Sequence, residues 1–177
     1  MSSKLDKTWH LADDSEAVAV TEFEFQLWRV FYSFLKWQED CQLYIGNDPL
    51  TGYELALLHI VRMKERPKTI YEISRLLNRD DPNNVQYSLG KLIKLGLIEK
   101  VKLESTKKAL SYQVTAKGIK NTDAYQDARQ DILLKLFKDT GIDSLQLETV
   151  ARSLNSARSL YDEASRLAAS YRNEDLI

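Results

Sequence analysis

Apolar residues recur at helical spacing along most of the chain. The first such region covers about residues 17–45 and is rich in aromatic side chains. These side chains cover too wide a surface for one amphipathic stripe, so we expect this helix to pack on two sides. Its apolar positions are Phe23, Leu27, Trp28, Phe31, Phe34, Leu35 and Trp37. Residues 46–49, which read Gly-Asn-Asp-Pro, predict its end.

Three shorter helices follow, and each begins with its own signal. Thr51 and Thr69 are both followed three residues later by a glutamate, and this capping box predicts a helix start at each place. Asp81 before Pro82 predicts the third start, because Asp is a favoured N-cap and Pro fits the first helical position. We expect the third helix to stop at Gly96. The residues predicted to face inward are Leu55, Leu58, Val61, Ile73, Leu76, Leu77, Val85, Leu89, Leu92 and Ile93.

After Gly96 the apolar pattern changes from helical to alternating. Residues 98–103 and 110–114 alternate as two strands, and the polar residues 104–108 between them predict a hairpin loop. The order helix, helix, turn, helix and two-stranded ribbon is that of a winged helix-turn-helix. The sequence therefore predicts a mainly α protein with a small β-ribbon.

The C-terminal region returns to helical spacing. We expect one helix over about residues 116–138, a break at Gly141 and an N-cap at Asp143. In the final helix, apolar residues follow one another at steps of three and four, as in a coiled-coil seam. The seam residues are Leu147, Val150, Leu154, Ala157, Tyr161, Ala164, Ala168 and Tyr171. The seam packs either on the preceding helix or, as we favour, in self-association that uses both ends of the chain.

The charges are unevenly distributed. The net charge is only −1, but residues 51–120 contain fourteen Lys and Arg against seven Asp and Glu. The rest of the chain is correspondingly acidic. A basic segment inside an acidic frame is typical of polyanion binding confined to one region. The alternative is a chance excess of solvated lysines.

Several functional classes lack their sequence signals. There is no glycine-rich phosphate loop, nucleophile elbow or paired-histidine motif, so we expect no enzyme and no cofactor. His10, His59 and Cys41 have no metal-ligand spacing. No signal peptide or long apolar span is present, which predicts a cytoplasmic protein, associated with the nucleoid when it is bound to DNA.

Cys41 is the only cysteine, so an intramolecular disulfide is excluded. A thiol redox switch needs a lowered pKa and access. The neighbouring carboxylates of Glu39 and Asp40 disfavour the thiolate, so we expect an inert cysteine rather than a redox sensor.

Two segments carry a resemblance to a known family. Residues 84–98, Asn-Val-Gln-Tyr-Ser-Leu-Gly-Lys-Leu-Ile-Lys-Leu-Gly-Leu-Ile, and residues 114–118, Val-Thr-Ala-Lys-Gly, resemble the recognition helix and the exit from the wing in the MarR family of regulators. The resemblance covers residues 20–172 and implies a homodimer with interlocked terminal helices that binds double-stranded DNA at a pseudo-palindromic operator. Two features differ from the family's pattern. Tyr87 stands where the family often has arginine, and the wing has lysines instead of an Asp-Arg-Arg pattern.

The sequence pattern and this resemblance together predict a division of the chain. Residues 1–16 are polar, acidic and aperiodic, so we expect a mobile arm there, and we expect residues 17–48 to form an N-terminal dimerisation helix. Residues 49–115 form the winged helix-turn-helix DNA-binding domain, and residues 116–177 form C-terminal dimerisation helices.

With its apolar residues inward, the third short helix turns a polar face outward. Amide side chains pair with adenine edges in the major groove, and a tyrosine hydroxyl can donate to a base or a phosphate. The candidate base-contacting residues are Asn83, Asn84, Gln86 and Tyr87. Helix-start solvation is the alternative for the two asparagines. The candidate phosphate-contacting and wing residues are Arg75, Arg79, Lys91, Lys94, Lys107 and Lys108, for which solvated surface charge is the alternative.

Relatives of this kind often bind a small aromatic effector, and the chain offers residues for such a pocket. They are Trp28, Arg29, Phe31, Tyr32, Trp37 and Tyr53, with Arg29 as a carboxylate partner. Simple core packing is the alternative for the aromatic residues. The competing function for the whole chain is a winged-helix module that binds another protein without specific DNA binding.

Overall fold

The structure is a computed structural model of the 177-residue chain. It describes all residues except 1–9, 13, 46–48, 80, 103–109 and 175–177. The chain divides into two units, Met1–Arg129 and Gln130–Ile177. None of the helices in the described part is long and apolar enough to cross a membrane.

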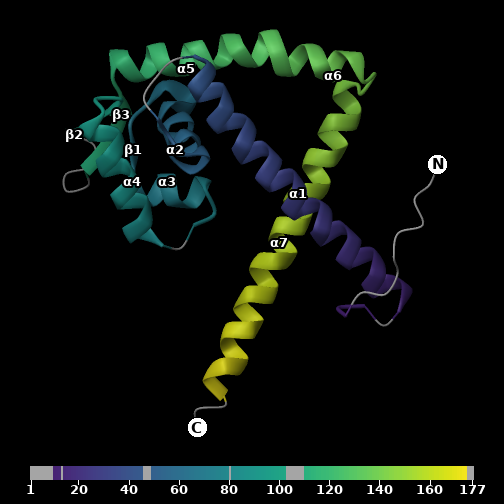
Figure 1. Cartoon of the computed structure of the whole chain (residues 1–177). Helices are drawn as coiled ribbons and strands as arrows, with labels where there is room; N and C mark the ends of the chain where they lie inside the picture. The colour runs from purple at the N-terminus through teal and green to yellow at the C-terminus, as the bar shows by residue number, and fades with distance from the viewer. Residues whose placement is uncertain (1–9, 13, 46–48, 80, 103–109, 175–177) are drawn as a thin grey trace. The chain divides into compact units, whose positions relative to one another are not determined.

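The first unit contains five α-helices and three strands among its described residues (Figure 1). A single 3₁₀ turn, Met63–Glu65, follows α2. The elements are α1 (Ser15–Tyr44), α2 (Gly52–Arg62), β1 (Lys68–Thr69), α3 (Ile70–Leu76), α4 (Pro82–Lys94), β2 (Ile98–Lys102), β3 (Leu110–Val114) and α5 (Ala116–Ala128). This order confirms the predicted winged helix-turn-helix.

The hydrogen bonds of the helix caps confirm the predicted helix starts. Thr51 and Thr69 both form complete capping boxes with the glutamate three residues later. The Asp81 side chain accepts hydrogen bonds from the amides of Asn83 at 3.1 Å and Asn84 at 3.3 Å. Each cap satisfies amides that the first helical turn leaves without a partner.

The sheet has three strands rather than the predicted two. Its order is β1-β3-β2, and both pairings are antiparallel. Lys68 of β1 lies opposite Tyr112 of β3. β1 was not predicted, because a strand of two residues is too short for an alternating pattern to be visible.

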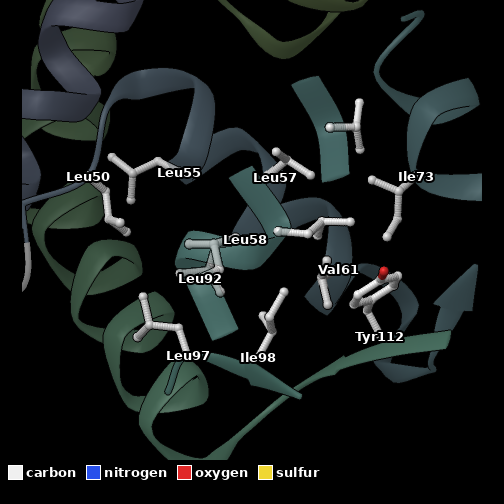
Figure 2. Packing of buried hydrophobic residues seen from close by; sticks show 12 residues of the cluster. Leu50, Leu55, Leu57, Leu58, Val61, Ile73, Leu92, Leu97, Ile98 and Tyr112 are labelled. Atoms are coloured by element: carbon white, nitrogen blue, oxygen red, sulfur yellow. The ribbon is translucent and has the colours of Figure 1, made fainter. Parts of the chain in front are cut away.

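The core lies between α2, α3, α4 and the sheet, and Figure 2 shows its side chains converging from these elements. The residues predicted to face inward are buried or partly buried in it, with one exception. Leu76 is 45% exposed, so its predicted burial is wrong. Ile73 and Leu77, four residues apart, occupy the inward stripe of this short helix, and Leu76 lies beside that stripe.

The C-terminal part was predicted as one helix over residues 116–138, but the structure interrupts it. After α5 the backbone forms a π-helical segment, Arg129–Leu134, and then α6, Lys135–Asp139. A π-helical segment contains wider turns than an α-helix, and nothing in the apolar spacing signals this change.

The last helix, α7, spans Ser144–Glu174. The Asp143 carboxylate accepts a hydrogen bond from the amide of Gln146 at 2.8 Å, which confirms the predicted cap. None of the eight seam residues is buried in the described chain, and Ala157 alone among them is even partly covered. The seam is therefore left exposed within its own unit, and the favoured alternative, self-association through this seam, stays a prediction.

Candidate nucleic-acid interface

The N-terminal half of α4 presents a polar surface to solvent. Its inward stripe, which includes Val85, Leu89 and Leu92, is almost completely buried. The candidate base-contacting residues on its other side are all exposed, namely Asn83, Asn84, Gln86 and Tyr87. Tyr87 is 77% exposed. The Asn84 amide also donates to the Asp81 carboxylate, so the helix cap holds this side chain in place.

The candidate phosphate-contacting residues have different environments. Arg75 and Lys94 are exposed. Arg79 is exposed too, and its guanidinium lies over the Tyr53 ring at 5.3 Å from the centroid, a cation–π contact that restricts its direction. Lys91 is half-buried and forms an ion pair with Glu54. Lys107 and Lys108 lie outside the described residues.

The C-terminus of α4 is held by residues 114–118, the segment that resembles the exit from the wing in the MarR family. Gly96 has φ +70°, and the amides of Gly96 and Leu97 donate to Ile93 and Leu92 at 2.9 and 3.0 Å, which is a Schellman motif. The Thr115 hydroxyl donates to the Gly96 carbonyl at 2.6 Å. This segment therefore connects the end of α4 with the start of α5.

Two further groups in the same segment complete this connection. The Lys117 ammonium donates to the Leu95 carbonyl at 2.9 Å, a favourable position for a cation at a helix C-terminus. A Cβ added at Gly118 would lie 2.0 Å from the Leu97 carbonyl oxygen. Glycine at this position lets α5 approach the backbone that leaves α4.

Three exposed side chains of the winged helix were not among the predicted contact residues. Tyr71, at the start of α3, is 73% exposed. Lys100 and Lys102 lie on β2 and are exposed. The signal for the lysines was available, because residues two apart in a strand share a face. For Tyr71 the sequence offered one signal of exposure. It is an aromatic residue at a helix start, and no apolar residue lies at helical spacing from it.

The residues predicted to form an effector pocket are distributed over three environments. Trp28, Phe31 and Tyr32 are exposed on α1, and Arg29 lies over the Phe25 ring at 5.5 Å. The other two belong to separate apolar clusters, Tyr53 to that of the winged helix and Trp37 to a smaller one. The described chain does not bring these six residues together around one cavity.

Tyr53 packs against the core of the helix-turn-helix rather than in a ligand site. Burial raises the pKa of its hydroxyl. The positive charge of Arg79 opposes this shift, and the negative charge of Asp81 adds to it. The side chain therefore supports the turn between α3 and α4, where these two charged residues lie.

The smaller cluster lies where α1 and α5 meet. Cys41, Tyr125 and Ala128 are buried there, and the His59 ring of α2 lies 4.6 Å from the Tyr125 ring. Burial raises the pKa of the Cys41 thiol, which agrees with the prediction of an inert cysteine. Burial, and secondly the charge of Arg62, lower the pKa of His59. An open surface pocket of about 510 Å³ lies beside His59 and Tyr125, and no sequence pattern indicated it.

A buried lysine closes the turn after α2. Lys68 is 1% exposed, and its ammonium donates to the carbonyls of Val61 and Arg66 at 3.0 Å each and to that of Met63. Burial lowers the pKa of Lys68. This residue belongs to the basic segment by sequence, but its charge stabilises backbone carbonyls inside the domain and is not available to DNA.

The described residues contain no group of three or more His, Cys, Asp or Glu side chains placed to hold a metal ion.

Comparison with known proteins agrees with this geometry. The model of a winged helix DNA-binding domain family matches residues 50–118. MarR of Staphylococcus aureus, in complex with salicylate and kanamycin, superposes with a TM-score of 0.62 over 82% of this chain and 93% of that chain, at 21% identity. This chain has the MarR fold.

Two further structures extend the match. AbfR of Staphylococcus epidermidis gives a TM-score of 0.65 over 84% of this chain and 94% of its own, at 16% identity. FabT of Streptococcus pneumoniae, in complex with DNA, gives 0.60 over 81% and 98%, at 17% identity. A sequence search of curated proteins gives no match. The MarR fold that was expected from residues 84–98 and 114–118 is thus confirmed.

Proposed function

We propose that this protein is a DNA-binding transcription regulator of the MarR type, which contacts the major groove through α4. The observation that carries this proposal is the exposed polar face of α4, with Asn84, Gln86 and Tyr87 on a helix whose opposite face is buried. The match to a winged helix DNA-binding family and the likeness to a FabT–DNA complex support it. The basic charge of residues 51–120 favours a polyanionic partner.

The test is selection of random DNA duplexes by the purified full chain at near-physiological salt, followed by sequencing. We expect enrichment of a two-fold symmetric site whose half-sites lie about one helical turn apart. A variant with Asn84, Gln86 and Tyr87 all replaced by alanine should lose this enrichment and keep its fold. If the native chain enriches no sequence, site-specific regulation is refuted.

The salt dependence of binding separates this proposal from the protein-interaction module. Contacts with phosphates release counterions, so the logarithm of the DNA affinity should fall linearly with the logarithm of the salt concentration. A chain that binds no duplex at low salt, and instead binds a protein with little salt dependence, would support the module.

We further propose a homodimer that forms through residues 17–48 and 116–177. The exposed apolar side chains of α1 and the exposed seam of α7 support it, because monomeric proteins rarely leave large apolar patches uncovered. In sedimentation experiments the chain should behave as a dimer. Leu154→Glu, in the seam, should weaken the dimer, whereas Ser156→Glu, on the other side of α7, should not. A native chain that sediments as a monomer would contradict the proposal.

Control by a small aromatic effector stays a prediction. Its support is the salicylate complex of S. aureus MarR, which shares the fold of this chain. Salicylate can serve as the probe in a titration of the protein bound to its selected duplex. Release of the duplex would support the prediction, and an unchanged affinity would argue against salicylate as an effector.

A further inference from the structure

Lys91 differs from the other polar residues on its side of α4. Asn84, Tyr87 and Lys91 are spaced by three and four residues and so share one stripe of the helix. Tyr87 is 77% exposed. The Lys91 side chain is 38% exposed, and its Nζ lies 2.7 Å from Oε2 of Glu54 in α2. Lys91 is therefore committed to a partner inside the domain.

The carboxylate that holds Lys91 is almost completely buried. The Glu54 side chain is 8% exposed, and its Oε2 also accepts a hydrogen bond from the Thr51 amide at 2.9 Å. A buried carboxylate is costly unless it is paired with a cation and hydrogen-bonded. If Lys91 moved out to a phosphate, Glu54 would lose the cation that compensates it. The structure thus opposes a direct role of Lys91 in DNA contact.

The Glu54 end of the pair is itself fixed. The Gly52 amide, two residues earlier, donates to Oε1 of Glu39 in α1 at 3.0 Å. A Cβ added at Gly52 would lie 2.7 Å from a methyl carbon of Leu35, so the start of α2 lies directly against α1. Lys91 consequently connects α4 to a region where α1 and α2 are in close contact.

We propose that Lys91 is a positioning residue, which through Glu54 fixes the rotation of α4 and thereby the directions of Asn84 and Tyr87, and that it does not contact a DNA phosphate. This inference rests on the proposed function of α4 in DNA binding. The capping of Asn84 by Asp81 holds one end of the stripe, and the Lys91–Glu54 pair holds the other.

The decisive variant is Glu54→Gln, because the two roles of Lys91 predict opposite changes. Glutamine also serves in a capping box, so the start of α2 is retained. If Lys91 positions α4, losing the ion pair should weaken binding to the selected duplex, by roughly tenfold. If Lys91 contacts a phosphate, Glu54→Gln releases it and removes a negative charge, so binding should be unchanged or tighter. Fluorescence anisotropy with labelled duplex measures the difference.

Two further variants give independent readouts. Lys91→Met should weaken binding without changing the slope of log affinity against log salt, whereas each lost phosphate contact makes this negative slope shallower by about 0.9. Lys94→Met is the matched control for the loss of a lysine charge from α4, because Lys94 is exposed and lies three residues further along the helix. The double variant Glu54→Gln with Lys91→Met leaves no unpaired carboxylate at position 54 and should bind more tightly than Lys91→Met alone. A shallower slope for Lys91→Met than for the native chain, or a double variant as weak as Lys91→Met, would overturn the inference.

A readout without DNA separates this inference from the proposed function. If the native chain binds no duplex, the proposed function fails, but hydrogen exchange still reports on the ion pair. The positioning role predicts faster exchange of the α4 amides in Glu54→Gln than in the native chain or Lys94→Met. Unchanged exchange in α4 would contradict it.

Discussion

Replacing Gly118 by alanine tests the close approach between α5 and the backbone that leaves α4. The added Cβ would lie 2.0 Å from the Leu97 carbonyl oxygen and 3.0 Å from its carbonyl carbon. Real Cβ atoms do not approach backbone this closely, so either α5 or the start of β2 must move. Because the obstacle is backbone rather than a flexible side chain, we expect an overpacking cost of about 3 kcal/mol.

Part of this cost is offset by helix propensity. Gly118 lies in the first turn of α5, and alanine is favoured over glycine in a helix by up to about 1 kcal/mol. The net loss should be about 2 kcal/mol, which lowers the melting temperature of a domain of this size by roughly 4–8 °C.

Gly90→Ala is the matched control for this substitution. Gly90 lies inside α4, and a Cβ there would meet no atom within 4 Å. It gains the same propensity without a clash, so its melting temperature should rise by roughly 2–4 °C. Scanning calorimetry on both variants decides the question. If Gly118→Ala melts at or above the native temperature, the steric reasoning is refuted.

Three more predictions concern a buried lysine, a paired carboxylate and a buried thiol. Lys68→Met should reduce the free energy of unfolding by about 2–4 kcal/mol in urea titrations, because three carbonyls lose a charged donor, and a loss below about 0.5 kcal/mol would contradict this. Arg66 and the Thr69 amide lower the pKa of Glu72, so its contribution to stability is complete above the ordinary pKa of 4.5 and is lost as the pH falls toward the lower folded value. Urea titrations against pH should therefore show a smaller loss of stability on acidification in Glu72→Gln, and equal losses would refute it. Cys41 should react slowly with a thiol reagent in the native chain and rapidly in urea, whereas equal rates would show that it is accessible.

Much of the fold was predictable because its signals are local. Capping boxes at Thr51 and Thr69 and the Asp81 cap each depend on residues within one helical turn, and all three formed as predicted. The inward stripe of α4 followed from its helical spacing alone. The exposure of Asn84, Gln86 and Tyr87 followed from the same spacing, since residues opposite a buried stripe face solvent.

The local signals failed where an element is very short or changes its geometry. The two-residue strand β1 has no alternation to detect, and its pairing with β3 depends on residues more than forty positions away. The π-helical segment Arg129–Leu134 keeps an ordinary apolar composition, so its spacing predicts an α-helix. Leu76 was assigned to the core because a short helix offers two nearly equivalent inward stripes.

What the sequence by itself determined is the order of the elements, the starts of the helices and the side of α4 that faces solvent. Only the tertiary structure decided which lysines are available to DNA. Lys68, Lys91 and Lys94 are alike in the sequence, but one is buried among carbonyls, one is paired with Glu54 and one is exposed. Charge composition counts all three equally, whereas the availability of each charge depends on partners that are distant in the chain and brought close only by folding.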